Sequence, residues 1–441
     1  MAKLTRVTDW YLKWKSSLAN AIERLLHDKL EDIVNVKDFG ALGNSSADDT
    51  AAIRRAAEAI RDAYAADGKQ RTLRIPDGQY MTTGTIVIYL GTRLECQGHV
   101  IFQNGSVDKS FPAFELQGNG RKTVLGIIDN YGAGFVVRGN TQDVWFHTIS
   151  NCTDAFIIRA DTNWSVTKNN LDNKITGVQI GHCTNGVVFE QNAQGLVQQG
   201  NEVRVNFIAE TQNSALFRTY DGFTHTAQSN WDSNFIELQA SDPLSIPDSA
   251  MVRNATAFPV PNLTFLVLGW CGGWVPDAGT ICLIRGQFTS SRFKFNLAAR
   301  VGLNEVVDTS SRASFGSCTV DLMRHSNLGS GTSFYTAVPP NDVFNGGVAV
   351  TNDKFRVRVS IPDLTAGQVF GSSFWHVLVQ RSGTARVRLE QVDGAPQARN
   401  GLLVEITDAG TERQGMVRVW VRNTTGATVT ARDLDLIISA S

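Results

Sequence analysis

Residues 34–60, VNVKDFGALGNSSADDTAAIRRAAEAI, decide how the rest of the chain is interpreted. The segment starts with alternating apolar and polar side chains, and Gly40 and Gly43 then mark a tight turn. Asp48 and Asp49 open a run of Ala, Ile and Arg. Aspartate is favoured at a helix start because its carboxylate accepts hydrogen bonds from free amides and lies at the positive end of the helix dipole. The segment therefore predicts a strand, a tight loop and a helix capped by these aspartates.

The same segment resembles the opening motif of the pectate-lyase-like β-helix superfamily, V-x-D-F-G-A-x-G-D-G-x-x-D-D-T-x-A-I. The chain departs from the motif at Asn44-Ser45, where the family usually has Asp-Gly, and a second block, IPDGQY at 75–80, resembles the family's I-P-x-G-x-Y. The resemblance implies an all-β body, a right-handed parallel β-helix of the kind found in many phage tailspikes, and says nothing about the substrate. The first motif is matched at Val36, Asp38, Phe39, Gly40, Ala41, Gly43, Asp48, Asp49, Thr50, Ala52 and Ile53.

The composition is that of a folded chain, with 42% hydrophobic and 19% charged residues among 441. The 41 basic and 42 acidic residues balance, so no nucleic-acid partner is expected. No apolar run is long enough to cross a bilayer, so no membrane insertion is expected. The basic start lacks the apolar core of a secretory signal. The six cysteines contain no C-x-x-C pair, and neither a metal nor another cofactor is expected.

Residues 1–33 carry apolar side chains at spacings of three or four, which predicts an amphipathic helix. Such a helix is marginal by itself. It either packs on its own body, or forms a three-chain bundle or the peptide that attaches a spike to a virion. The second interpretation is favoured because the motif at residue 34 already begins the body. The stripe consists of Tyr11, Trp14, Leu18, Ile22, Leu25, Leu26, Leu30 and Ile33.

The predicted body covers residues 34–326. Its helix should end near Ala66, before Asp67-Gly68, and its small apolar face should let it cap the open end of a sheet stack. From Leu73 to Met323, short strand-like runs alternate with turns rich in Asn, Gly, Ser and Asp. This pattern predicts the coils of a parallel β-helix, whose inward residues stack into one apolar core. The period is irregular, so a series of β-sandwiches remains an alternative.

Residues 327–441 contain longer strands with clean alternation, such as FRVRVSI, GLLVEIT and MVRVWVRN. Five or six amphipathic strands of this kind predict a C-terminal antiparallel β-sandwich. Such a domain resembles those that hold three spike chains together or bind sugars, and the sequence does not choose between the two roles.

Glycoside hydrolysis needs one protonated carboxyl group and one ionised carboxylate. No motif for a serine nucleophile, a dinucleotide or a metal is present. The densest group of acids and aromatics lies between residues 202 and 242, and coils about 4.8 Å apart could bring two acids to a useful separation. Each acid could instead be a solvated strand residue or a salt-bridge partner. The predicted catalytic residues are Glu237, Asp232, Glu202 and Asp221, and the predicted substrate-binding residues are Arg204, Tyr220, His225, Trp231 and Lys294.

Taken as a whole, the chain resembles a phage-type tailspike, and we expect a homotrimer that is made in the host cytoplasm and joined to the virion tail or baseplate through residues 1–33. Its ligand would be a bacterial surface polysaccharide, either capsule or O-antigen. The first hypothesis is hydrolysis by paired carboxylates. The second is a lyase, in which His225, Tyr220 or a basic residue removes a proton beside a uronic carboxylate. The third is a spike that binds without cutting.

Overall fold

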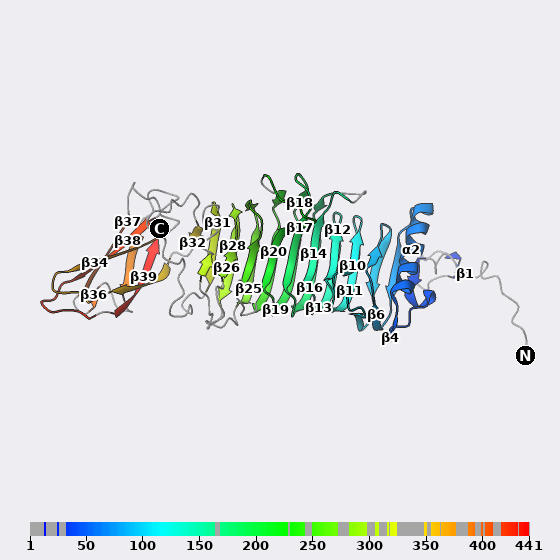
Figure 1. Cartoon of the computed structure of the whole chain (residues 1–441), viewed down its shortest axis with the longest axis horizontal. Helices are drawn as coiled ribbons and strands as arrows, with labels where there is room; N and C mark the ends of the chain where they lie inside the picture. The colour runs from blue at the N-terminus through cyan, green and yellow to red at the C-terminus, as the bar shows by residue number, and fades with distance from the viewer. Residues whose placement is uncertain are drawn as a thin grey trace, which may run out of the picture. The chain divides into compact units, whose positions relative to one another are not determined.

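The computed structural model of the protein describes most of the residues between 32 and 297 and shorter stretches elsewhere (Figure 1). It divides into two compact units, residues 1–206 with 220–223, and residues 207–219 with 224–441. The described ranges are 13–14, 24–25, 32–163, 168–227, 230–242, 249–271, 282–297, 305–307, 315–316, 318–323, 348–350, 354–361, 363–375, 387–392, 398–399, 402–408, 416–430 and 432–440.

The first unit opens with strand β3 (Ile33–Asn35), a 3-10 turn (Val36–Phe39), strand β4 (Asn44–Asp48) and helix α2 (Thr50–Asp67). The predicted strand therefore ends earlier than its alternation suggested, because the Asn35 side chain accepts the amide of Lys37 and starts the 3-10 turn.

The two adjacent aspartates have different partners, which corrects the prediction that both cap the helix. Asp48 does accept the Thr50 amide at the helix start, at 3.0 Å. Asp49 makes no capping bond to α2, and its buried carboxylate accepts the amides of Leu42 and Gly43 at 2.7 and 3.0 Å. Asp49 thus fixes the preceding turn, and the motif is structural.

Helix α2 closes the first coil of its unit, as the sequence predicted. Ala52, Ile53, Ala56, Ala57 and Ile60 form its buried face, and α2 lies beside the first strands in Figure 1. The helix ends where Gly68 adopts a left-handed φ of 69° and donates its amide to the Tyr64 carbonyl.

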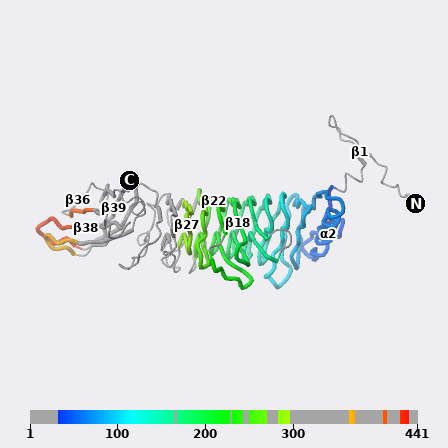
Figure 2. The backbone as a smooth tube through the Cα atoms, turned by 90° about the horizontal axis from the view of Figure 1, so that it is seen from above, coloured from blue at the N-terminus to red at the C-terminus, as the bar shows by residue number. Residues whose placement is uncertain are grey.

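Parallel strands follow one another as turns of a β-helix through the first unit (Figure 2). One sheet has the order β3-β5-β8-β11-β13-β16-β19, with β4, β6 and β9 paired beside it, and a second has the order β17-β14-β12-β10-β7, while β15 pairs with β18. Their bounds are β5 Arg71–Ile75, β6 Gly78–Thr82, β7 Ile86–Ile88, β8 Thr92–Cys96, β9 Val100–Asn104, β10 Pro112–Gln117, β11 Lys122–Asp129, β12 Ala133–Arg138, β13 Asp143–Ser150, β14 Asp154–Ala160, β15 Asn170–Leu171, β16 Lys174–Gly181, β17 Asn185–Gln191, β18 Val197–Gln199 and β19 Glu202–Ala209.

The core of the first unit is a stack of inward side chains in register. Phe114, Phe135 and Phe156 occupy the same position on β10, β12 and β14, and the rings of Phe135 and Phe156 stack with centroids 5.0 Å apart. Burying one such aromatic ring per coil removes a large apolar area from water. The stack confirms the predicted parallel β-helix and excludes a series of sandwiches for this unit.

The length of a coil changes within the first unit, which explains the irregular sequence period. Pro112 pairs with Ala133, 21 residues later, whereas Asp154 pairs with Asn185, 31 residues later. The longer coils contain the additional short strands β15 and β18 between the two main sheets.

The second unit contains further parallel coils and, at the end of the chain, two antiparallel sheets. Its parallel sheets have the orders β22-β25-β28-β31-β32, β29-β26-β23-β20 and β24-β27-β30. The bounds are β20 Asn213–Thr219, β21 Asn230–Asp232, β22 Phe235–Asp242, β23 Ala250–Asn254, β24 Val260–Pro261, β25 Thr264–Cys271, β26 Cys282–Arg285, β27 Phe288–Thr289, β28 Arg292–Leu297, β29 Glu305–Val307, β30 Phe315–Gly316, β31 Cys318–Met323 and β32 Val348–Val350.

The antiparallel sheets have the orders β33-β39-β35 and β34-β38-β37-β36, which agrees with the predicted C-terminal sandwich. Strand β34 begins earlier than the predicted run FWHVLVQ, of which the residues after 375 lie outside the described ranges. The bounds are β33 Lys354–Ile361, β34 Val369–Trp375, β35 Val387–Val392, β36 Ala398–Arg399, β37 Leu402–Asp408, β38 Met416–Asn423 and β39 Arg432–Ala440.

Of the predicted N-terminal segment, the structure describes Lys13–Trp14, Arg24–Leu25 and residues 32–33, of which Ile33 begins strand β3. Lys13–Trp14 and Arg24–Leu25 form the short antiparallel strands β1 and β2, so the helix prediction is wrong at these residues, because apolar spacing alone does not distinguish a helix from a hairpin. The rest of the predicted stripe up to residue 31 lies outside the described ranges. No helix in the described part of the chain is long and apolar enough to cross a membrane.

Candidate functional site

The predicted residues Glu202 and Arg204 lie on the outer face of β19, on either side of the buried Val203. They pair with each other at 2.5 Å between Oε1 and Nε, and their side chains are 37% and 48% exposed. Exposed ion pairs contribute little because water screens them. In the structure, Glu202 is therefore an exposed carboxylate neutralised by its neighbour.

Two predicted acids of the second unit have local partners. Asp232 is half-buried and accepts hydrogen bonds from Asn262 at 2.7 Å and Ser233 at 3.1 Å, so it joins two successive coils. Glu237 is half-buried and accepts the Gln239 amide at 2.9 Å. Lys294 shares the Glu237 column of the sheet, with Leu266 between them. The fold therefore brings Glu237 and Lys294 to one outer face, as predicted.

His225 and Trp231 lie in the core, although they were predicted to bind substrate. Trp231 is fully buried, and its ring contacts His225 edge-to-face with centroids 5.3 Å apart. Burial lowers the pKa of His225. Because Trp231 presents no face at the surface, the structure does not support its predicted role as a sugar platform.

Tyr220 and Asp221 follow β20 in the chain and belong to the first unit. Asp221 is exposed and adopts a left-handed φ of 58°. Tyr220 is half-buried, and its ring lies under the Arg159 guanidinium, 4.5 Å from the centroid. Tyr220 is thus the predicted residue that leads to a group of charged side chains the sequence did not reveal.

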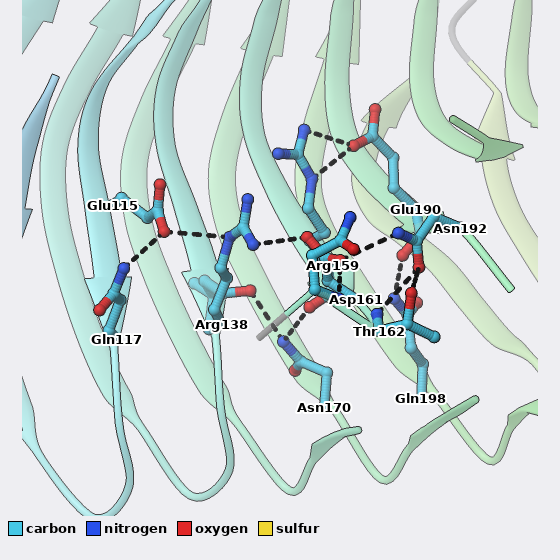
Figure 3. Close-up of polar contacts among 12 residues, drawn as sticks. Glu115, Gln117, Arg138, Arg159, Asp161, Thr162, Asn170, Glu190, Asn192 and Gln198 are labelled. Carbon is cyan, nitrogen blue, oxygen red and sulfur yellow. Dashed lines mark hydrogen bonds and ion pairs between the residues drawn. The ribbon is translucent and has the colours of Figure 1, made fainter. Parts of the chain in front are cut away.

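This arginine–carboxylate cluster lies along the sheet of β10, β12, β14 and β17 (Figure 3). Arg138 ends β12 and lies between two carboxylates, 3.1 Å from Glu115 and 2.5 Å from Asp161. Asp161 follows β14, is 4% exposed, and also accepts the Asn163 amide at 2.8 Å and Asn192 at 2.9 Å. The cluster comprises Glu115, Arg138, Arg159, Asp161, Glu190 and Tyr220.

The second half of the cluster is a buried pair on β14 and β17. Arg159 donates from Nε and Nη2 to Oε2 of Glu190, at 2.9 and 2.7 Å. The Glu190 side chain is 2% exposed and that of Arg159 is 19% exposed. Burying a charge is costly unless it is paired and hydrogen-bonded, and this pair meets both conditions.

Electrostatics assign protonation states to two members of the cluster. Burial disfavours the charged form of Asp161, but the nearby Tyr220 hydroxyl, the Asn163 amide, the Arg138 charge and Asn192 together outweigh burial, so the pKa of Asp161 is lowered. Burial and the Asp161 carboxylate raise the pKa of Tyr220. At neutral pH the cluster therefore combines an ionised carboxylate with a hydroxyl that keeps its proton.

This arrangement can bind a polar ligand and can carry acid–base chemistry. An ionised carboxylate such as Asp161 can attack a sugar carbon or activate water, and Tyr220 can donate a hydrogen bond. Within the described residues, no group of three or more His, Cys, Asp or Glu is placed to hold a metal ion.

One sequence signal for the cluster was available. Arg138, Arg159 and Glu190 each close an apolar run, in GFVVR, AFIIR and GVVFE. A charge that recurs at the end of successive inward runs indicates an outer column of ionisable side chains. The unequal coil lengths hid this alignment in the sequence.

The fold defines a protein of the parallel β-helix class, with buried ion pairs on the outer side of one sheet. Residues 33–107 match a family model described as rhamnogalacturonase A/epimerase, pectate lyase-like. No curated protein matches the chain.

Among solved structures, the chain is similar to a mutant tailspike protein of the E. coli bacteriophage HK620, with 11% identity, a TM-score of 0.33, and coverage of 99% of this chain and 98% of that chain. It is also similar to ORF18 of Geobacillus virus E2, with 14% identity, a TM-score of 0.39, and coverage of 92% and 77%. A third is PfbA, a surface adhesin of Streptococcus pneumoniae, with 12% identity, a TM-score of 0.33, and coverage of 66% and 84%.

Proposed function

We propose that the protein is a phage tailspike that binds and depolymerises a bacterial surface polysaccharide, either a capsule or an O-antigen. The parallel β-helix and the pectate-lyase-like match at residues 33–107 support this class of function. The observation that carries the proposal is the arginine–carboxylate cluster. Two of its three carboxylates, Asp161 and Glu190, are almost fully buried on the outer side of the sheet. Buried ionisable groups of this density are typical of functional sites.

The proposed reaction is glycoside hydrolysis by two carboxyl groups. Asp161 and Glu190 lie on successive coils. To act as the acid, Glu190 would have to leave its pair with Arg159 and take up a proton. The Asp161 carboxylate, held ionised by Arg138, is the candidate nucleophile or base. The acids predicted from the sequence, Glu202, Asp221, Asp232 and Glu237, remain a second candidate set.

Purified capsule and O-antigen from a panel of bacterial strains provide the test. Hydrolysis releases new reducing ends without ultraviolet absorbance. A lyase would instead produce an unsaturated uronate that absorbs, because it removes a proton beside a carboxylate. Binding without either product would leave only a receptor-binding spike, and absence of binding to every polysaccharide would contradict the proposal.

Matched substitutions distinguish the two sets of acids. Asp161→Asn and Glu190→Gln should each lower the rate of reducing-end release by about 100-fold or more, because each removes a reacting carboxyl group. If Glu237→Gln, Asp232→Asn, Glu202→Gln or Asp221→Asn has that effect instead, the site belongs to the sequence-predicted set. Asp38→Asn, at an exposed position near the start of the first unit, is the control.

The proposed organisation follows the sequence boundaries. Residues 1–33 would attach the spike to the virion, residues 34–326 would form the polysaccharide-binding body, and residues 327–441 would hold three chains together or bind sugars. Light scattering of the full chain should give the mass of a homotrimer. Phage carrying a deletion of residues 1–33 should lack the spike on their virions.

A further inference from the structure

We propose that the outer face of β11, β13 and β16 holds a second carbohydrate-binding site, in which the Trp145 ring stacks on a neutral pyranose and His147 hydrogen-bonds a hydroxyl group. The inference rests on the proposed function, since it takes the ligand to be a polysaccharide. It adds a site remote in topology from the arginine–carboxylate cluster, because the cluster lies on the other main sheet of the first unit.

Trp145 is exposed in the middle of strand β13. On β13 its neighbours Val144 and Phe146 are fully buried, while the Trp145 side chain is 36% exposed. Among the exposed large hydrophobic residues of the described ranges, it is the aromatic one. Leaving an indole ring partly in water forfeits some of the burial that usually stabilises it. A single exposed ring is common, so the side chains around it carry the inference.

The ring stands above smaller neighbours. In register, Trp145 lies between Val124 of β11 and Thr176 of β16, both of which are half-buried. Two residues along β13, the exposed His147 ring lies at a centroid distance of 6.3 Å and an interplanar angle of 73°. Its Nδ1 is 2.8 Å from the Thr148 hydroxyl, which leaves Nε2 facing away from that bond.

The other side of the ring is bordered by a column of exposed charges. Lys122, Asp143 and Lys174 occupy one register position on β11, β13 and β16, so positive and negative charges alternate along the stack. The opposite charges of Lys122, Asp143 and Lys174 largely cancel one another's electrostatic field. These side chains can therefore hydrogen-bond a ligand without strongly selecting an anionic one.

This combination fits a sugar better than a protein partner. A pyranose has one face of C–H groups and a rim of hydroxyls, which match the indole face and its polar borders. A protein interface would bury the charges beside Trp145, and charged residues are depleted in interface cores because their desolvation is costly. The coil spacing of about 4.8 Å is close to the length of one sugar unit, so a glycan lying along the axis would stay in step with the coils.

The experiment compares Trp145→Ala and Trp145→Phe with Leu90→Ala, whose side chain is also 36% exposed. The probe is the capsule or O-antigen that the wild-type protein binds, as long polymer and as its shortest cleavable fragment. Trp145→Ala should bind the polymer about tenfold more weakly, because stacking on the ring is lost. The affinity of Trp145→Phe for the polymer should lie between those of Trp145→Ala and wild type, and the affinity of Leu90→Ala should equal that of wild type. Cleavage of the short fragment should be unchanged in all three.

Each other outcome overturns the proposal in an identifiable way. Equal polymer binding by Trp145→Ala and wild type would show that Trp145 is not part of a binding site. A change of oligomeric mass in Trp145→Ala or Trp145→Phe would assign the ring to a contact between copies of the chain. A wild-type protein that binds no polysaccharide would contradict the proposed function itself, before the variants are compared.

Discussion

Breaking the Arg159–Glu190 pair should destabilise the first unit, and the loss should depend on which partner is removed. Removing one member of a buried ion pair costs about 3–5 kcal/mol, because the other charge is left without compensation. Arg159 keeps 19% of its side chain in contact with water and rests on the Tyr220 ring, whereas the Glu190 side chain is 2% exposed. Glu190→Ala should therefore lower the free energy of unfolding by about 3 kcal/mol. Arg159→Ala leaves the more buried charge of Glu190 without a partner and should lower it by about 5 kcal/mol.

Replacing both residues together should recover most of this loss. An apolar pair of similar volume in place of a buried ion pair is often neutral, so Arg159→Leu with Glu190→Leu should lie within about 1 kcal/mol of wild type. The two single leucine variants complete a double-mutant cycle that isolates the interaction between the side chains.

Amide hydrogen exchange of peptides that cover β14 and β17 is the suitable assay, because a protein with more than one compact unit need not unfold in a single transition. A loss of about 3 kcal/mol corresponds to exchange faster by roughly a hundredfold. Unchanged exchange in Glu190→Ala, or a double variant as unstable as the sum of the single ones, would refute the reasoning.

Three further predictions concern the first unit. Asp49→Ala leaves the Leu42 and Gly43 amides without their acceptor and should lower the free energy of unfolding, measured with denaturant, by about 2–6 kcal/mol. The exposed control Asp38→Ala should lower it by less than about 0.5 kcal/mol. Equal losses in the two variants would contradict the role given to Asp49. Gly177→Ala places a Cβ against the buried Phe146 ring and should lower the melting temperature by the equivalent of about 1–3 kcal/mol. Gly181→Ala, on the same strand, meets ordinary contacts and should not lower it. Since the folded pKa of Asp161 is lowered, its stabilising contribution is present above its unfolded pKa of about 3.9 and is lost as pH falls through the folded value. A plot of stability against pH should thus lose part of its acid slope in Asp161→Asn, and an unaltered slope would show that Asp161 is not responsible.

Much of the scaffold was predictable because its signals are local. The buried face of α2 and its end at Gly68 follow from helical spacing and a glycine stop, and both are present. The role of Asp49 was mispredicted because capping rules consider the helix that follows, whereas its partners, Leu42 and Gly43, precede it.

The candidate site was less predictable because it depends on how coils stack. Arg138 and Asp161 meet across one coil step, and Arg159 and Glu190 across another. The step changes from 21 to 31 residues between them, so no constant period in the sequence aligns the four. Trp231 was predicted to bind substrate because it lies among the acids between residues 202 and 242, yet it is buried, and β21 is too short for alternation to assign its inward side.

The pairing of each coil with only the coil before and the coil after has a consequence for synthesis. In the first unit, α2 blocks one end of the stack, so a growing chain can add strands in one direction only, using the last completed coil as a template. A nascent chain that has reached residue 138 already holds a capped stack whose last strand, β12, awaits β14. If elongation stalls there, the unpaired edge of β12 can form hydrogen bonds with the same edge of another stalled chain. Premature termination should then yield ordered end-to-end aggregates and not a pool of unfolded fragments.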